Sequence, residues 1–167
     1  MFLIFILAFL CGCLKDMKPA TLGNSAAARR ILIYSQDTDF KRRVIAEFLN
    51  KLGSTEWHYE INGLNQIGQH NLSSYNTVVI LSPIKGAVID ERVEQFLNKQ
   101  LPHPKIIVCY TYGFESLKDR IKWDYQVDAI SSASRISSVP TVVDKLVEHI
   151  QLDWGAVNSG VPDNVSE

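Results

Sequence analysis

The residues best suited to chemistry lie in three short segments, each of which follows an apolar run. Hydroxyls, amides and carboxylates gather there, and such groups can bind a phosphate, a planar ring or a metal ion. Open α/β sheets bind their ligands beyond the carboxyl ends of buried strands, so these segments form our candidate binding site. They are Ser35-Gln36-Asp37-Thr38-Asp39, Ser82-Pro83-Ile84-Lys85-Gly86 and Thr111-Tyr112-Gly113.

Alternating strand and helix patterns position these segments. Unbroken β-branched runs predict buried strands, and apolar residues at three- and four-residue spacings predict helices that cover a sheet. This alternation predicts an α/β fold: a three-layer, doubly wound, five-stranded parallel sheet in the flavodoxin-like order 2-1-3-4-5, with 57–61 near an edge. The predicted strands are 31–35, 57–61, 77–81, 105–110 and 125–130, and the predicted helices are 40–52, 88–97 and 141–152.

Composition narrows the classes of partner. The chain has 167 residues and a formal net charge of −1, which fits one compact domain with extra segments. An even balance of acid and base provides no basic field for nucleic acid, so we predict no nucleic-acid partner. The protein partner stays unknown at this stage.

The amino terminus is an export signal in this interpretation. Residues 1–10 are apolar but too short to span a bilayer, as in a signal-peptide core. Leu10-Cys11-Gly12-Cys13 resembles the lipobox of bacterial lipoproteins, which implies a lipid on Cys13 and a membrane-anchored protein of the cell envelope. The pattern departs from that family in having no Lys or Arg before the core, and an uncleaved apolar anchor or a mistranslated leader is the alternative.

The chain therefore divides into four parts. We predict a signal peptide with lipobox over 1–13 and a flexible tether over 14–29, rich in small and polar residues. The folded domain covers 30–154, and the polar stretch 155–167 forms a disordered tail.

The segment from Tyr75 to Gly86 resembles the part of flavodoxins in which a strand runs into a loop beside the flavin ring. Thr111-Tyr112-Gly113 resembles the other ring-flanking loop, and Ser35–Asp39 occupies the position of the phosphate loop. The resemblance implies flavin mononucleotide (FMN) as cofactor and at most an FMN-dependent electron carrier or reductase.

The phosphate loop departs from the flavodoxin pattern. Thr38 stands where that family has a glycine, and Asp37 and Asp39 lie where a phosphate dianion would sit. Two like charges about 4 Å apart cost roughly 4 kcal/mol at an effective dielectric of 20. The alternative interpretation is that Asp39 caps a helix, Asp37 forms a turn and no ligand binds there.

Other chemical residues favour structural roles. The Asp37 and Asp39 pair could bind a metal as in receiver domains, but Ser82 and Thr111 replace the residues that such a site needs, so we predict no metal. Cys109 lies in a buried-strand pattern, which predicts an inert thiol in the core.

Tyr112 and Trp123 could stack on a planar ligand or could only pack against other side chains. Arg135 lies away from the site, and the histidines, at 58, 70, 103 and 149, read as surface residues without metal-ligand spacing.

Two hypotheses follow from these residues. The first is a membrane-tethered flavodoxin-like domain that binds FMN for electron transfer. The second is a non-catalytic flavodoxin-like interaction or scaffold module that has lost its phosphate loop, as Asp37, Thr38 and Asp39 indicate. Another small ligand at the same edge stays open under either hypothesis.

Overall fold

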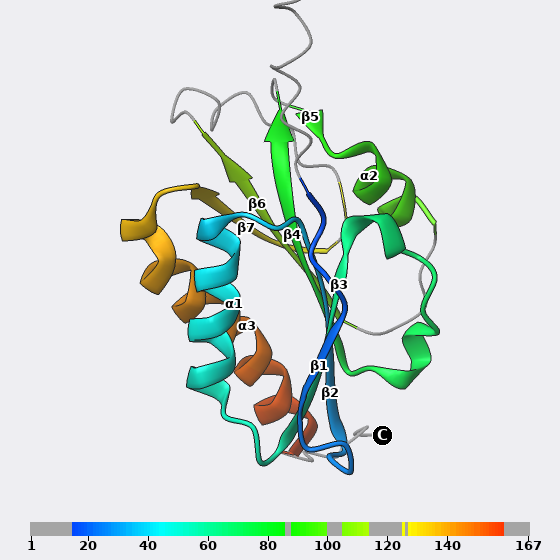
Figure 1. Ribbon diagram of the computed structural model, residues 1–167. Helices are drawn as coiled ribbons and strands as arrows, with labels where there is room; N and C mark the ends of the chain where they lie inside the picture. The colour runs from blue at the N-terminus through cyan, green and yellow to red at the C-terminus, as the bar shows by residue number, and fades with distance from the viewer. Residues whose placement is uncertain (1–14, 86–87, 100–104, 114–124, 126, 159–167) are drawn as a thin grey trace, which may run out of the picture.

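The computed structural model describes residues 15–85, 88–99, 105–113, 125 and 127–158, with side chains as far as Gln151. Within these ranges the chain forms a mixed sheet with helices on both faces (Figure 1). The strands are β1 (Ala20–Gly23), β2 (Arg29–Ser35), β3 (Trp57–Gly63), β4 (Thr77–Lys85), β5 (Val88–Ile89), β6 (Lys105–Tyr112) and β7 (Asp128–Ala133). The α-helices are α1 (Asp39–Leu52), α2 (Glu91–Leu97) and α3 (Val139–Asn158).

The sheet has seven strands in the order β1-β3-β2-β4-β6-β7, with β5 paired to β4. The strands β3, β2, β4, β6 and β7 are mutually parallel, whereas β1 and β5 are antiparallel to their neighbours. The prediction of five strands in an all-parallel sheet is therefore wrong in number and in direction. The region predicted as an edge, β3, lies between β1 and β2 because β1 covers its outer side.

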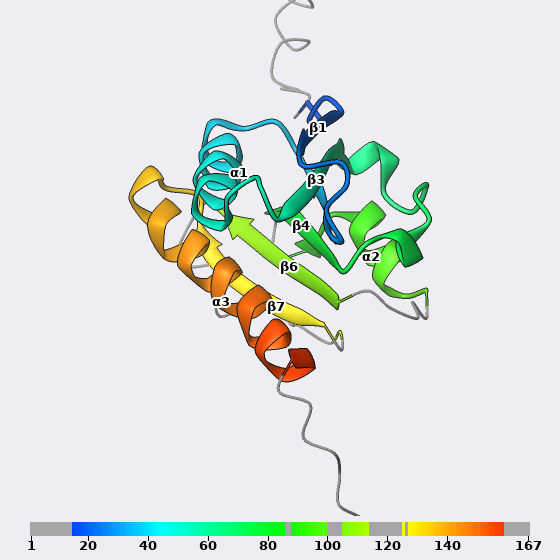
Figure 2. The same ribbon diagram turned by 90° about the horizontal axis from the view of Figure 1, so that it is seen from below.

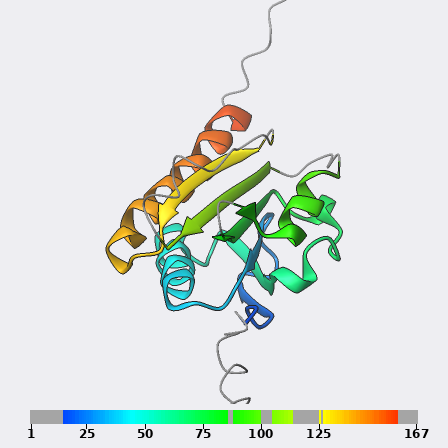
Figure 3. The same ribbon diagram turned by 90° about the horizontal axis from the view of Figure 1, so that it is seen from above.

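Successive side chains of the central strands point to opposite faces of the sheet and form two separate hydrophobic cores. In β2, Ile31 and Ile33 face α1 and α3, whereas Leu32 and Tyr34 face α2. Figures 2 and 3 show this division, with α1 and α3 on one side of the sheet and α2 on the other. A strand buried on both faces is mostly apolar along its length, and for this reason the sequence of β2 and β4 predicts buried strands.

The stretch predicted as a flexible tether, 14–29, differs most from expectation. From Lys15 onward it belongs to the fold, since β1 pairs with β3 from Ala20↔Ile61 to Gly23↔His58. Gly23 has φ +81°, and a Cβ there would lie 2.2 Å from the carbonyl oxygen of Trp57. This close approach needs glycine, and it sets β1 directly against the start of β3.

Two boundaries around the second predicted segment also differ. Ser82–Lys85, expected to leave the sheet, continues β4 and pairs with β6 as far as Pro83↔Thr111. Because β2 pairs with β4 only to Leu81, Pro83 lies beyond that ladder and its missing N–H breaks no bond to β2. Val88 and Ile89, expected in a helix, form β5, and α2 starts after its N-cap Asp90.

The carboxyl-terminal elements are displaced along the chain. β7 covers Asp128–Ala133 and not 125–130, because the small residues Ser132 and Ala133 are buried in it. α3 continues to Asn158, so part of the predicted tail is helical, and 159–167 lies outside the described residues. Among the described residues, no helix is long and apolar enough to cross a membrane.

Candidate functional site

The three predicted segments meet where the parallel strands end, which we call the carboxyl edge of the sheet. The carboxyl ends of β2, β4 and β6 are adjacent, with the registers Ser35↔Leu81, Ser82↔Tyr110 and Pro83↔Thr111. This pairing brings the described parts of the three segments together. Their role in binding a cofactor stays a prediction. The order in which the chain adds parallel strands switches sides between β2 and β4. Open α/β sheets bind ligands at such a switch point.

A strap formed by Lys15, Asp16 and Met17 closes the β2–α1 loop. The Met17 N–H donates to the Ser35 carbonyl oxygen at 3.1 Å, and the Asp37 N–H donates to the Lys15 carbonyl oxygen at 2.6 Å. Asp16 and Gln36 form an antiparallel bridge between these bonds. The strap therefore uses the amide of Asp37, a donor that a bound phosphate would need.

The acids of the same loop are held by a neighbouring arginine. Arg42 forms ion pairs with both Asp37 and Asp39. The N-cap of α1 is Thr38, whose hydroxyl accepts from the Lys41 N–H at 3.3 Å, so the interpretation of Asp39 as the cap is wrong by one residue. A phosphate in this loop would compete with Lys15 for an amide and with two carboxylates for Arg42. The residues of the loop do not fit the phosphate of FMN.

The two segments expected beside a flavin ring are closed against each other. Ser82 is fully buried, and the Thr111 hydroxyl donates to its carbonyl oxygen at 3.4 Å. Tyr112 is 4% exposed and packs in a small apolar cluster with Ile84 and Ala133. Its ring is therefore a packing group and not a rim group. Gly86 and Trp123 lie outside the described residues.

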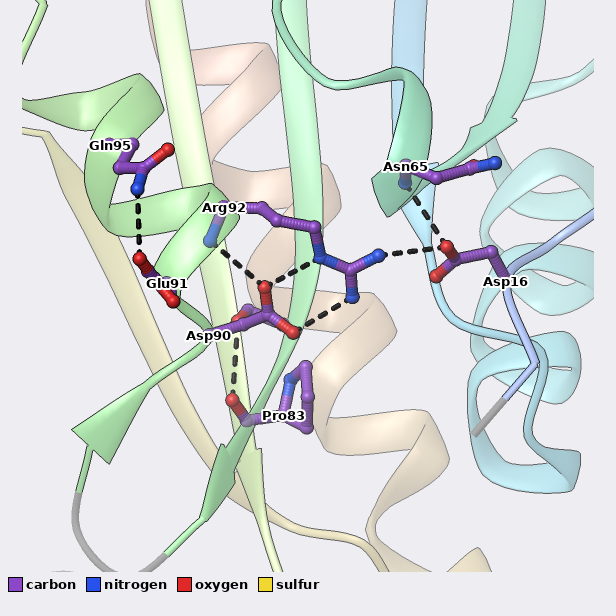
Figure 4. A network of polar contacts seen from close by, with 8 residues as sticks. Asp16, Asn65, Pro83, Asp90, Glu91, Arg92 and Gln95 are labelled. Atoms are coloured by element: carbon purple, nitrogen blue, oxygen red, sulfur yellow. Dashed lines mark hydrogen bonds and ion pairs between the residues drawn. The ribbon is translucent and has the colours of Figure 1, made fainter. Parts of the chain in front are cut away.

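Sequence reasoning missed a charged network beside this edge (Figure 4). The Arg92 guanidinium donates from Nε and Nη2 to Asp90 at 2.8 and 2.9 Å and from Nη1 to Asp16 at 2.8 Å. Asp16 also accepts from the Asn65 N–H at 3.2 Å. Hydrogen bonds from Arg92 outweigh burial and hold the pKa of Asp90 below its usual range. Nothing local in the sequence marks the link from Arg92 to Asp16.

Three buried polar atoms near the strap have no hydrogen-bond partner among the described residues: Lys41 Nζ, Gln36 Oε1 and Asp16 Oδ1. Lys41 is 2% exposed. Burial lowers its pKa to about 8, although Cys109, Asp90 and Asp16 act in the opposite direction. One amine and two acceptor oxygens at this edge therefore form no hydrogen bond within the described part of the chain.

Cys109 and His58 are both buried in the sheet. Cys109 is fully buried, and burial raises the pKa of its thiol to about 12, which keeps it protonated and unreactive. His58 is 6% exposed, so its prediction as a surface residue is wrong; it lies in β3, and Gly23 of β1 is its register partner. The described residues contain no group of three or more His, Cys, Asp or Glu side chains that could hold a metal ion.

Two hollows open near this edge. One, of about 450 Å³, lies against the β4–β5 hairpin and the start of α2 and is lined by residues that include Pro83, Lys85, Val88 and Arg92. The other, of about 280 Å³, lies between β7 and α3. Neither is lined by residues of the β2–α1 loop, so the predicted phosphate segment opens into neither hollow.

Comparison with known proteins gives similarity of fold only. No protein-family model and no curated protein matches the chain. A flavodoxin from the domain Archaea is similar at 10% identity over 74% of this chain and 99% of that chain, with a TM-score of 0.47. General stress protein 14 of Treponema denticola, in complex with FMN, is similar at 9% identity over 74% and 98%, with a TM-score of 0.45.

A third structure, the rubredoxin oxygen:oxidoreductase of Desulfovibrio gigas, is similar at 12% identity with a TM-score of 0.46. The match covers 75% of this chain but 37% of that chain, so this chain spans little more than a third of it. At these identities and TM-scores, neither cofactor nor activity follows for this chain. It is an α/β protein with a mostly parallel sheet, and the solved structures that it resembles include flavodoxin-like folds.

Proposed function

We propose that this chain is a non-catalytic, flavodoxin-like interaction module that is anchored at the cell envelope by a lipid on Cys13. The observation that carries the first part is the hydrogen bond from the Asp37 N–H to the Lys15 carbonyl oxygen at 2.6 Å, which places the strap across the phosphate position. Anions bind at such loops through free backbone amides, and this amide is occupied. The Asp37 and Asp39 carboxylates also hold Arg42, so a phosphate would have to compete with them for its guanidinium.

The second candidate function is FMN-dependent electron transfer. The adjacency of Pro83 and Thr111 favours it, because a flavin ring would lie against the ends of the two strands that contain them. If FMN binds, its ring supplies the electron transfer, and the accessible residues that could hold that ring are Pro83, Lys85 and Gly113. The closed β2–α1 loop makes this the weaker candidate.

Titration of FMN with the purified chain separates the two candidates. The fluorescence of FMN is followed as the protein is added, with a flavodoxin as the positive control. We expect no saturable quenching up to high micromolar protein. Quenching that saturates at low micromolar concentration would overturn the interaction module and support the electron carrier.

The lipid anchor rests on Leu10-Cys11-Gly12-Cys13 and has its own test. Intact mass spectrometry of the protein from its native host is expected to show a chain that starts at Cys13 and carries diacylglycerol. A Cys13→Ser variant is expected to lose the lipid mass and to leave the detergent phase in a phase-partition assay. An unmodified Cys13 in the natural protein would remove the anchor from the proposal.

A further inference from the structure

The strap fixes where the amino-terminal part of the chain joins the folded domain. Lys15 and Met17 are hydrogen-bonded to the β2–α1 loop, and Asp16 pairs with Arg92. Cys13 precedes Lys15 by two residues, and two trans peptide units span at most about 7–8 Å between Cα atoms. A lipid on Cys13 would hold the carboxyl edge of the sheet close to the bilayer, with no long tether between them.

Exposed apolar side chains are concentrated at the same end of the strands. Among the described residues, the exposed large apolar side chains are Leu22 (47%), Val88 (61%) and Ile136 (49%). Val88 lies in β5, which pairs with the carboxyl end of β4, and Ile136 follows β7 at the start of a 3-10 turn. Leu22 differs, because it pairs with Tyr59 in the amino half of β3.

Each of these two apolar side chains has a cation beside it. Lys85 is the register partner of Val88, and Arg135 directly precedes Ile136; both cations are exposed. An apolar side chain next to a cation suits the interfacial zone of a bilayer. The apolar group enters the headgroup region, while the cation stays at the level of the lipid phosphates.

Several acids among the described residues of this edge are already paired with arginines. Four of them are held in ion pairs, Asp37 and Asp39 by Arg42 and Asp16 and Asp90 by Arg92. Glu91, exposed in the first turn of α2, offsets one cation. Among the described residues of this edge, Lys85 and Arg135 are exposed cations that can meet an anionic surface.

We propose that the carboxyl edge of the sheet faces the membrane in the anchored protein. In this arrangement Val88 and Ile136 enter the headgroup region, and Lys85 and Arg135 contact the phosphates of anionic phospholipids. The inference rests on the lipid anchor at Cys13 proposed above. It adds an orientation and a lipid contact that the anchor alone does not require.

Fluorescence of a probe on single introduced cysteines tests this orientation. The lipidated protein is reconstituted on vesicles of phosphatidylcholine with phosphatidylglycerol, and an environment-sensitive dye is attached to Val88→Cys or to Leu22→Cys. Cys109 is fully buried and will not react under native conditions. We expect the emission at position 88 to rise about twofold and shift to the blue as the dye leaves water, with no change at position 22.

Flotation of the vesicles separates the two proposals. If the protein does not float with the vesicles, the anchor fails and the orientation fails with it. If it floats but position 88 stays in water, or position 22 responds as strongly, the orientation alone is overturned. A Lys85→Glu, Arg135→Glu double variant is expected to float normally and to lose most of the response at position 88. An unchanged response in that variant would overturn the contact with anionic phospholipids.

Discussion

The side-chain amine of Lys41 is buried and has no hydrogen-bond partner among the described residues. Burial lowers its pKa from 10.5 to about 8, so the folded protein binds this proton less tightly than the unfolded chain does. Between about pH 8 and 10.5 the unfolded state therefore holds more protons, and the contribution of Lys41 to stability rises with pH. The rise amounts to roughly 3 kcal/mol across the window.

Replacing Lys41 with methionine tests this cost. Lys41→Met keeps the length and apolar stem and removes the charge, so we expect a gain of about 1–3 kcal/mol in the free energy of unfolding at pH 7.5. The variant should also lack the rise between pH 7.5 and 9.5. Urea unfolding at both pH values measures this, and tyrosines and Cys109 titrate alike in the two proteins. Lys51→Met, at an exposed ion pair with Asp144, is the control with little expected change. A parallel pH dependence in Lys41→Met and the natural protein would contradict the argument.

Glu60 is the centre of a polar group on the α2 side. It accepts from the Tyr75 hydroxyl at 2.5 Å and lies 3.2 Å from His70 Nε2, while His70 Nδ1 lies 2.8 Å from the Tyr34 hydroxyl. Burial disfavours the Glu60 carboxylate, but hydrogen bonds from Tyr75 and Asn62 and the charge of His70 prevail and lower its pKa. Its stabilisation is therefore present above the ordinary glutamate pKa and is lost as the pH falls through the lowered value.

Glu60→Gln is expected to destabilise the fold by about 1–2 kcal/mol at pH 7, because charge-assisted hydrogen bonds become neutral ones. The difference from the natural protein should shrink as the pH falls below the ordinary pKa of glutamate and through the lowered pKa of Glu60. Urea unfolding between pH 3.5 and 7 measures it. Glu47→Gln, on the exposed side of α1, should leave both quantities unchanged. A loss in Glu60→Gln that is independent of pH would point to packing and not to charge.

At the scale of elements, two glycines with the same backbone angle separate strain from collision. Gly23 and Gly53 both have φ +81°, but a Cβ at Gly23 would meet the Trp57 carbonyl oxygen at 2.2 Å, whereas Gly53 has open space. Gly53→Ala should cost about 1–3 kcal/mol from the backbone alone, because its φ of 81° and ψ of 171° lie in a region that is essentially restricted to glycine. Gly23→Ala should cost more and should expose the amides of β1 to hydrogen exchange. Equal losses and unchanged exchange in β1 would show that β1 adapts to the side chain.

The elements that could be predicted share one property, a local pattern. β2, β4 and α1 were readable because each buries a regular set of apolar residues. β1 is exposed throughout and β5 has two residues, so neither has a pattern, and both form only because a partner strand is already in place. β7 was misplaced because its buried positions hold serine and alanine, which carry little strand signal.

At the scale of the whole molecule, the place of the candidate site was predictable and its closure was not. Three strand ends must meet at one edge of a parallel sheet, which follows from chain direction alone. The strap closes that edge through Asp16 and Arg92, which are 76 residues apart, and no local pattern connects them. A segment that looks like a tether can thus belong to the fold when its partners are distant in sequence.

Shortening the chain tests that membership directly. A chain that starts at Arg29 loses the strap, β1 and the packing of Met17 against the core, so we expect its melting temperature to fall by roughly 5–15 °C relative to a chain that starts at Lys15. A chain that starts at Lys18 keeps β1 but lacks the strap, and it should lie between the two. Thermal unfolding followed by circular dichroism measures all three. If the three melting temperatures coincide, residues 15–28 contribute nothing to the fold, and the predicted tether was right. If the chain from Lys18 melts as low as the chain from Arg29, the strap is what holds β1 in place.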